Sequence, residues 1–398
     1  MTVSACSRKS VHPGEAPGPD LEEVDGTWHV RDAAMVREVL RSKDGTTQAG
    51  FTSESVSTSR LRQPILFADG EEHRTQRSRI ARFFAPRVVS DRYRDMMGQR
   101  VDSLLSAAGR EITLDDLAME YSVSVAAEVI GLTNSSTAGL SRRLENLFDQ
   151  PGYDHTTSGG GRSRLTRVLA RLTGASPLIP FYLFDVRPAV RARRRTPSED
   201  VITHLIGEGY KGVEIMIECL TYGAAGMVTT REFICMATWH FLGAPALRQR
   251  YLVAGEKERL AILGEILRLE PVVGHLYRRT TRDLQVGGRV IPAGALMDLH
   301  VRDANADEDV VGESPLELCP GRDIATGYGP EVISFGDGAH KCPGNALAIQ
   351  ETDILMQRLL AMDLTVVSEP TMTWDDLITG YRLRNFRLIV GPQAATHE

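Results

Sequence analysis

The chain of 398 residues has few cysteines, and their arrangement excludes two common kinds of site. The five cysteines are an odd number, and no two of them form a Cys-x-x-Cys pair. An odd, widely spaced set argues against a disulfide framework, and the missing pairs argue against a cysteine-rich zinc site. We therefore expect reduced thiols and a cytoplasmic location. The cysteines are Cys6, Cys219, Cys235, Cys319 and Cys342.

The sequence also lacks a long apolar run near its start and a strong charge of either sign. Residues 1–20 contain three prolines and no apolar core, so we expect neither a signal peptide nor a membrane anchor. The formal net charge of -6 is mild, which argues against nucleic acid as the main partner. With 42% hydrophobic residues, the composition is that of a globular protein with a large core.

Hydrophobic periodicity predicts a mainly helical chain in which short strands appear near both ends. We expect a flexible tail over residues 1–24, then a strand over Thr27–Val30 and a helix over Ala33–Arg41. No linker divides the rest, so residues 25–398 are predicted to form one domain. Further helices are expected over 87–107, 112–131, 137–148, 162–172 and 212–242, the last of which is apolar nearly all round and should cross the core.

Strand and loop signals return in the second half. The pair Gly287-Gly288, flanked by apolar alternation over 284–291, predicts a hairpin. Residues 364–367 and 386–390 are predicted to be short closing strands. The clearest irregular segment, residues 151–163, is interpreted either as a surface loop or as part of a lid.

One cysteine lies in a setting that suits a metal-bound thiolate. Residues 335–344 are Phe-Gly-Asp-Gly-Ala-His-Lys-Cys-Pro-Gly, in which Gly336 permits backbone angles that let the chain pass close to a flat ligand. A helix predicted over residues 345–361 directs its N-terminal amides and dipole toward Cys342, which should favour the thiolate. A thiolate is one of the axial ligands of haem iron. For an isolated cysteine, a buried free thiol beside a turn is the ordinary alternative.

This motif, together with Ala346 and Ala348 after it, resembles the haem-binding loop of the cytochrome P450 monooxygenases. The resemblance runs over residues 25–392. It implies an α+β fold that is mainly helical with small β-sheets, a triangular prism with haem b (iron protoporphyrin IX) between the long central helix and the cysteine-loop helix. Within the loop it implies Cys342 as the iron ligand, with Phe335, Gly336 and Gly344 beside the haem.

The resemblance also assigns a set of residues to the two haem propionates, which need cations or strong donors when buried. The set consists of His73, Arg77, Arg278 and His340. Each of these alone would more ordinarily be a solvated polar group. A second set, Glu265, Arg268 and Arg322, matches the family's Glu-x-x-Arg pair and its partner arginine, which lock the irregular segment before the cysteine.

The long helix contains the segment that matches the family's oxygen-activation motif, residues 225–230. Gly226, Thr229 and Thr230 are present, but Val228 stands where the family has an acid. Glu232 follows more than one turn later and is expected to point elsewhere. Protons must then come from ordered water, the substrate or Thr229. The substitution favours radical coupling over hydroxylation, while ordinary C–H hydroxylation stays open as the alternative.

The resemblance places a substrate pocket among mostly apolar residues, which suits a medium-sized aromatic compound with amide or hydroxyl groups. His275 is interpreted either as a polar anchor for that compound or as a structural residue. The predicted lining residues are Gln63, Phe67, Val228, Val273, His275, Leu276 and Thr379.

The chain is similar to actinobacterial members of the family in specialised metabolism, and more weakly to those that couple tryptophan-containing diketopiperazines. The resemblance implies a monomer that activates dioxygen with electrons from a ferredoxin and its reductase, which would dock near Lys341. It implies no membrane and no nucleic-acid partner. A haem-based binding or sensor protein is the alternative from another class, and the lack of an appended output domain counts against it.

Overall fold

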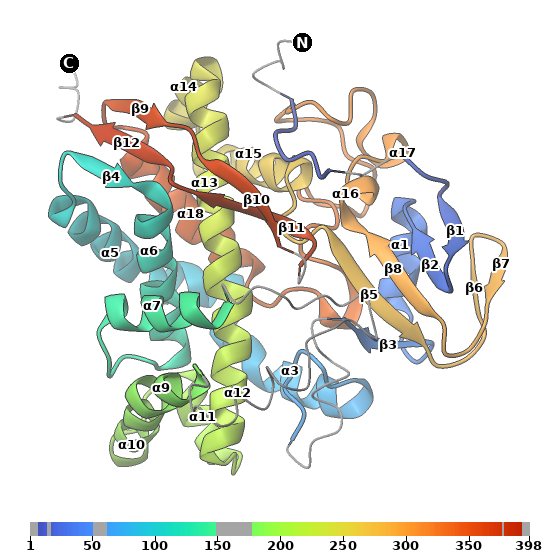
Figure 1. Ribbon diagram of the computed structural model, residues 1–398, viewed down its shortest axis with the longest axis horizontal. Helices are drawn as coiled ribbons and strands as arrows, with labels where there is room; N and C mark the ends of the chain where they lie inside the picture. Colours follow the sequence, from blue (N-terminus) through green and yellow to red (C-terminus); the bar gives the residue numbers. More distant parts are fainter. Residues whose placement is uncertain (1–6, 14–16, 51–61, 149–176, 376–377, 392–398) are drawn as a thin grey trace, which may run out of the picture.

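The computed structural model describes residues 7–13, 17–50, 62–148, 177–375 and 378–391. Helices dominate, and short strands gather toward two sides of the molecule (Figure 1). The helices are α1 Ala33–Arg41, α3 Gly70–Phe84, α4 Pro86–Val88, α5 Arg94–Ala107, α6 Leu114–Ile130, α7 Thr137–Phe148, α9 Leu178–Phe181, α10 Arg187–Arg195, α11 Val201–Gly207, α12 Gly212–Gly223, α13 Thr229–Gly243, α14 Pro245–Val253, α15 Glu256–Leu269, α16 Val301–Ala304, α17 Glu308–Val311 and α18 Asn345–Leu359.

The strands form four small sheets, and the larger two join segments far apart in the sequence. The five-stranded sheet has the order β1-β2-β8-β5-β3, and the three-stranded sheet has the order β4-β12-β9. The strands are β1 Leu21–Val24, β2 Thr27–Val30, β3 Thr46–Ala49, β4 Glu111–Thr113, β5 His275–Thr280, β6 Leu284–Val286, β7 Arg289–Ile291, β8 Leu296–His300, β9 Leu364–Ser368, β10 Thr371–Asp375, β11 Gly380–Arg384 and β12 Arg387–Val390.

The five-stranded sheet buries one face and gives the other to polar residues. β2 runs parallel to β8, with Trp28 opposite Met297 and His29 opposite Asp298. Because side chains alternate along a strand, Trp28 and Met297 enter an apolar cluster that also contains residues of α1, while His29 and Asp298 lie on the other face. The sheet therefore carries a separate polar face that its core does not use.

A long helix crosses the molecule, as the apolar stretch over 212–242 predicts. α12 and α13 follow one line through the middle of Figure 1, joined by a π-helical turn over Ala224–Val228. Most side chains of α13 are buried, including Phe233, Ile234 and Cys235. A π-helical turn inside a long helix widens the backbone locally, and such turns are frequent at functional sites.

The N-terminal residues correct one prediction. Residues 21–24 form β1 instead of a flexible tail, because they pair with β2. Ser10 is fully buried, and its backbone N–H donates to Oε2 of Glu270 at 3.1 Å. Arg8 donates from Nε to the Leu269 carbonyl at 2.8 Å. A buried carboxylate needs hydrogen-bond donors, so Glu270 binds this polar segment. Apolar periodicity gives no sign of such a polar contact.

Several predicted boundaries are confirmed. Residues 33–41 form α1, whose N-cap Asp32 accepts from the Met35 N–H at 2.7 Å. The predicted hairpin forms β6 and β7, with positive φ at Gly287 and Gly288. The helix expected over 112–131 starts two residues later, after β4. The predicted helix over 162–172 and the possible lid over 151–163 lie outside the described residues.

Candidate functional site

The loop before Cys342 is held in a tight, glycine-dependent path. The Cys342 N–H donates to the Phe335 carbonyl at 2.9 Å. Gly336 and Gly338 both have a φ of 67°. A Cβ on Gly338 would lie 2.1 Å from the Leu40 carbonyl oxygen, so only glycine fits where the loop passes α1. The glycines therefore let the loop pack against α1 while it presents Cys342 at the start of α18.

The helix end favours the Cys342 thiolate as expected, but burial outweighs this effect. Burial raises the pKa of Cys342, while the Gly344 N–H and the Arg77 guanidinium lower it by less. Cys342 as a residue is nevertheless only partly buried, at the point where the loop meets α18. A coordinated metal deprotonates a thiol outright, so a metal ion would supply the stabilisation that the protein groups do not.

Two of the four predicted propionate partners stack on each other. The His73 and His340 rings lie 3.9 Å apart, and Nε2 of His340 lies 3.1 Å from a carboxylate oxygen of Asp69. Burial lowers the pKa of His73 to about 4, with a further contribution from His340. His73 is therefore a neutral hydrogen-bonding group at neutral pH. Asp69, which the sequence analysis did not identify, already occupies one ring nitrogen of His340.

The two predicted arginines are cations with few partners. Arg278 is 4% exposed, and its Nη1 donates to the Tyr277 carbonyl at 2.8 Å. Arg77 donates from Nη2 to the Lys341 carbonyl. Burial lowers the pKa of Arg278 to about 10. Among the described residues, no carboxylate forms an ion pair with either guanidinium. Because buried charges need counter-charges, this position fits the carboxylates of a bound group.

The π-helical turn leaves an open surface within an otherwise buried helix. Ala225 is exposed, and among the described residues no atom beyond the adjacent helix backbone lies within 4 Å of where a Cβ of Gly226 would stand. The Thr229 hydroxyl donates to the Ala225 carbonyl, and the Thr230 hydroxyl donates to the Gly226 carbonyl at 2.7 Å. Val228 is buried and apolar. The arginine and histidine donors, the cysteine at the start of α18 and the space beside Gly226 together fit a haem group.

Glu232 points away from this turn, as expected. Its carboxylate is fully buried and accepts the Leu383 N–H at 2.7 Å. It also pairs with Arg384 and with Arg231. These contacts tie α13 to β11 and leave Glu232 no role beside Gly226.

Glu351, on α18, is an acid that the sequence analysis missed. Burial raises its pKa well above the usual value, so it carries a proton at neutral pH. The nearby Thr230 hydroxyl lowers this pKa by less than burial raises it, and Oε2 of Glu351 has no hydrogen-bond partner among the described residues. The only signal in the sequence is a pair of acids, Glu351 and Asp353, inside the helix that follows the cysteine, and such acids more often mark an exposed helix face.

The predicted structural network is assembled. Arg268 donates from Nε and Nη2 to the two oxygens of Glu265 at 2.7 and 2.8 Å. Arg322 lies 3.3 Å from Oε1 of Glu265, which also accepts the Cys319 N–H at 2.9 Å. Arg322 donates further to the carbonyls of Val311, Glu313, Ser314 and Glu317. The network therefore fixes a segment with little regular structure, as expected.

The predicted pocket residues lie on separate elements, and two segments are joined. The Gly274 N–H donates to the Ile378 carbonyl at 3.1 Å, which brings Val273 next to Thr379. Val228 lies in the π-helical turn. Gln63 and Phe67 precede α3, where the Phe67 N–H donates to the Pro64 carbonyl. A common role of these residues as pocket walls stays a prediction.

His275 and Leu276 face opposite sides of β5. Nδ1 of His275 lies 2.8 Å from Oδ1 of Asp298. This ring nitrogen therefore makes a structural contact within the protein, as the second interpretation of His275 predicts. Leu276 instead faces the cysteine loop, since its Cδ1 lies 3.6 Å from where a Cβ of Gly336 would stand.

The chain is similar to known proteins over most of its length. The cytochrome P450 family model matches residues 260–365. The erythromycin C-12 hydroxylase of Saccharopolyspora erythraea is 29% identical over 386 residues, covering 94% of this chain and 89% of the relative. A solved mutant of P450 EryK in complex with erythromycin B has a TM-score of 0.75 at 25% identity, covering 95% of this chain and 94% of that one. The hydroxylase HmtN, involved in himastatin biosynthesis, has a TM-score of 0.71 at 22% identity, covering 95% of each chain.

The chain belongs to the cytochrome P450 family. It is a bacterial monooxygenase with a haem-thiolate cofactor and a small-molecule substrate, which excludes the sensor alternative. The predicted P450 fold is confirmed. No helix in the described part of the chain has the length and apolar character to cross a membrane.

Proposed function

We propose that this chain binds haem b through Cys342 and hydroxylates a medium-sized aromatic natural product. The observation that carries the proposal is the placement of Cys342. This partly buried cysteine lies at the start of α18, on a loop whose path is fixed by glycines. When bound, the haem supplies the activation of dioxygen that no side chain can perform.

The protein groups that would hold the haem are those with unmatched hydrogen-bonding capacity. Arg77 and Arg278 are cations without a carboxylate partner among the described residues, and they would bind the propionates. His73 and His340 would add neutral donors at the same edge. Phe335, Gly336 and Gly344 would form the loop surface next to the sulfur.

Glu351 would be a proton source that does not depend on Val228. It holds a proton close to Thr230, whose hydroxyl donates to the Gly226 carbonyl at the π-helical turn. A buried acid with a raised pKa can serve as a general acid. Thr229 lies one residue earlier and orients its hydroxyl toward Ala225. A protonated acid near this turn supports hydroxylation, which needs a proton that Val228 cannot carry.

The substrate class rests on the predicted pocket and on one relative. The erythromycin C-12 hydroxylase acts on a natural product and aligns over most of this chain. The predicted walls are mainly apolar, with Gln63 and Thr379 as polar positions, which suits a substrate with a few hydrogen-bonding groups.

Oxidative coupling is a second candidate, favoured by Val228. That side chain is buried and apolar at the position where the family has an acid, so it contributes no proton beside Gly226. A coupling enzyme that joins two aromatic units, such as tryptophan-containing diketopiperazines, transfers no oxygen to the product. The two reactions therefore separate by product mass.

The partner and location follow from the same site. A ferredoxin, reduced by its reductase, would dock at the surface near Lys341, whose positive charge can meet an acidic partner. The four cysteines among the described residues form no disulfide, which supports a reducing cytoplasm. We expect a monomer.

The test is the carbon monoxide difference spectrum of the reduced protein, compared between wild type and Cys342→Ser. A strongly red-shifted Soret band that is lost in the variant supports thiolate ligation. A histidine-type spectrum that the substitution leaves unchanged contradicts the proposal. Turnover of an aromatic ligand under ¹⁸O₂ then distinguishes the reactions, because hydroxylation adds one labelled oxygen and coupling only removes hydrogen.

A further inference from the structure

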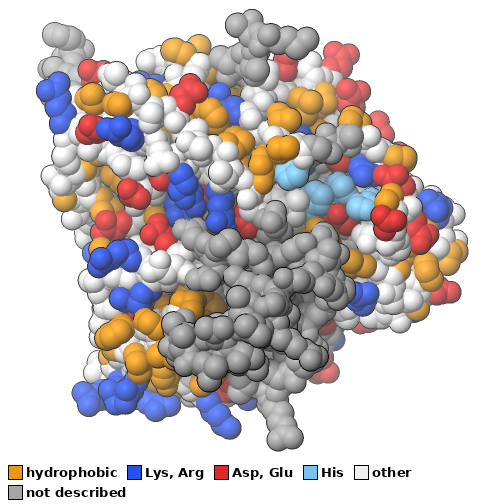
Figure 2. All heavy atoms as spheres, viewed as in Figure 1, with side chains coloured by type: hydrophobic (Ala, Val, Ile, Leu, Met, Phe, Trp, Pro, Cys, Tyr) orange, Lys and Arg blue, Asp and Glu red, His pale blue; other side chains and the backbone are white. Residues whose placement is uncertain are grey.

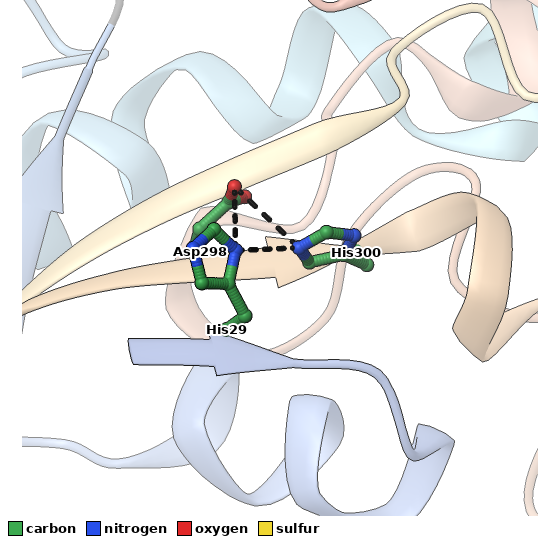
Figure 3. A group of neighbouring side chains, drawn as sticks. All are labelled: His29, Asp298 and His300. Carbon is green, nitrogen blue, oxygen red and sulfur yellow. Dashed lines mark hydrogen bonds and ion pairs between the residues drawn. The ribbon is translucent and has the colours of Figure 1, made fainter. Parts of the chain in front are cut away.

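The polar face of the five-stranded sheet holds a cluster of histidine and carboxylate side chains that the P450 chemistry does not use. His29 on β2 is opposite Asp298 on β8, and His300 lies two residues further along β8. All three side chains project from the same face, because residues two apart on a strand share a face. Figure 3 shows the two rings and the carboxylate converging on one point.

The converging atoms form a nearly equilateral triangle. Nδ1 of His29 lies 2.9 Å from Nε2 of His300. Oδ2 of Asp298 lies 3.4 Å from Nδ1 of His29 and 3.5 Å from Nε2 of His300. Within the described ranges, these residues are the one group of three or more such side chains whose donor atoms approach one another this closely.

This triangle has the size of one face of a tetrahedral metal centre. Zinc binds imidazole nitrogen and carboxylate oxygen at about 2.0–2.2 Å, which places neighbouring donors about 3.3–3.5 Å apart in a tetrahedron. Two of the three distances fall in this range, and the histidine pair is shorter by about 0.4 Å. A small side-chain rotation would bring that pair to the required separation.

Second partners already hold the donor groups in orientation. Nδ1 of His275 lies 2.8 Å from Oδ1 of Asp298, so the other oxygen of this carboxylate is the one turned toward the triangle. Nδ1 of His300 lies 3.4 Å from Oδ2 of Asp303. A carboxylate behind a ligating histidine fixes its tautomer and leaves the opposite nitrogen to bind metal.

The cluster is reachable from solvent. The side chains of His29, His300 and Asp298 are 23%, 11% and 9% exposed. Figure 2 shows histidine side chains at the molecular surface, over the part of the sheet that Figure 1 places on this side. These partly exposed side chains allow an aqueous ion to reach the donor atoms without unfolding the sheet.

We propose that His29, His300 and Asp298 bind one divalent transition-metal ion, and that zinc fits the site. Two imidazoles and one carboxylate form a common zinc donor set with one position left for water. The ion would join β2 to β8 and so fasten the N-terminal hairpin to the sheet. This site is separate from Cys342 and does not depend on the proposed substrate or reaction.

The competing account is a chain of hydrogen bonds without any ion. In that account one of the two close ring nitrogens, on His29 or His300, carries a proton and donates it to the other. Both accounts fit a short contact between rings, but only a bound ion requires both nitrogens to be unprotonated at once. Metal binding therefore separates the two accounts directly.

The experiment is calorimetric titration of ZnCl₂ into haem-loaded, EDTA-treated protein without a histidine tag. We expect one strong site in wild type. His29→Gln and His300→Gln should each weaken it by at least about 100-fold, because each removes a direct ligand. His204→Gln is the matched control, since His204 is a partly exposed histidine on α11 beside Arg82 and away from the sheet. It should leave zinc affinity unchanged.

The outcomes decide the proposal in both directions. Absence of a strong site in wild type, or affinity in His29→Gln equal to that in wild type, overturns it. Should the variants fail to fold, zinc X-ray absorption of the wild-type protein decides alone. Nitrogen and oxygen donors at about 2.0–2.1 Å with two imidazoles support the site, whereas a shell of water oxygens contradicts it.

Discussion

The two faces of strand β5 differ in whether their charged side chains have partners of opposite charge. On one face, Arg278 is buried without a carboxylate partner among the described residues, and Leu276 packs toward the cysteine loop. On the other face, His275 meets Asp298, whose second oxygen lies near two further histidines. Although burial opposes ionisation, the hydrogen bonds from His275 and His29 lower the pKa of Asp298.

The difference shows how unmatched charge can mark a ligand site. A buried cation without an anion in direct contact is costly. Arg278 has only the charge of Asp69 acting on it without a direct ion pair, so it indicates that a negatively charged group belongs beside it. Asp298 has its partners within the protein, so its cluster can exist without a ligand. The evidence for an ion at this cluster is therefore the arrangement of its donor atoms and not an uncompensated charge. Residues only three positions apart in sequence thus serve two separate sites, because a strand alternates its faces.

The largest effect should follow from a change in the loop on the first face. Gly338→Ala places a Cβ 2.1 Å from the Leu40 carbonyl oxygen at a φ of 67°, so the loop must shift. We expect a loss of about 4 kcal/mol or more in the free energy of unfolding, measured by urea denaturation. Gly288→Ala is the control, because its φ is 75° but no atom lies within 4 Å, so the expected cost is about 1–2 kcal/mol. Equal losses would mean that the contact with α1 is unimportant.

Removing the unmatched cation should weaken haem binding. Arg278→Gln is expected to lower haem affinity by about 100-fold, or about 3 kcal/mol, because a charged propionate loses its buried partner. The measurement is the haem-to-protein ratio after competition with apomyoglobin. Arg279→Gln is the matched control, since the neighbouring side chain points to the opposite face and donates to the Gly294 carbonyl. Similar haem loss in both variants would refute the distinction between the faces.

Glu218 extends the comparison to a buried acid without a cation. Burial raises its pKa to about 8, and one carboxyl oxygen has no partner. The folded state therefore keeps a proton that the unfolded state releases above about pH 4.5. Stability should fall as pH rises from about 4.5 to 8, by about 2–3 kcal/mol between pH 5 and pH 7.

The check is the free energy of unfolding as a function of pH for wild type and Glu218→Gln. The variant should lose this slope. Glu214→Gln, on the same helix, should retain it, because backbone N–H donors lower the pKa of Glu214. A wild-type slope that persists in Glu218→Gln would show that another group binds the proton.

The smallest effect concerns the matched face. His275→Gln replaces the imidazole that contacts Asp298, yet His29 and His300 remain beside this carboxylate. We expect a loss of about 1 kcal/mol in the free energy of unfolding and unchanged haem content. A large loss of haem would show that His275 also serves the haem side of the strand.

Local signals in the sequence predicted much of the fold. The cap at Asp32 with its apolar helix, the glycine pair at 287–288 and the segment 335–344 each encode structure within a few residues. Strand pairing over long distances gives no such signal, which explains why β3 and the β10–β11 pair were not predicted. Alternation along β5 did not become visible until its neighbours were known.

The same limit applied to the candidate site. Glu265 and Arg268 are three residues apart on one helix, so their pairing could be predicted. Asp69 and Glu351 become relevant only through contacts with His340 and Thr230 from other elements. The cluster of His29, Asp298 and His300 likewise depends on the register between β2 and β8, which no local pattern specifies.

The parallel pairing of β2 with β8 also has a consequence for synthesis of the chain. Thr27 pairs with Leu296, so the first strand leaves the ribosome long before its partner exists. At about 5–20 residues per second, β2 waits on the order of tens of seconds with an unpaired edge. Closing so long a loop is slow, so this sheet should form late and expose its edge to chaperones in the interval.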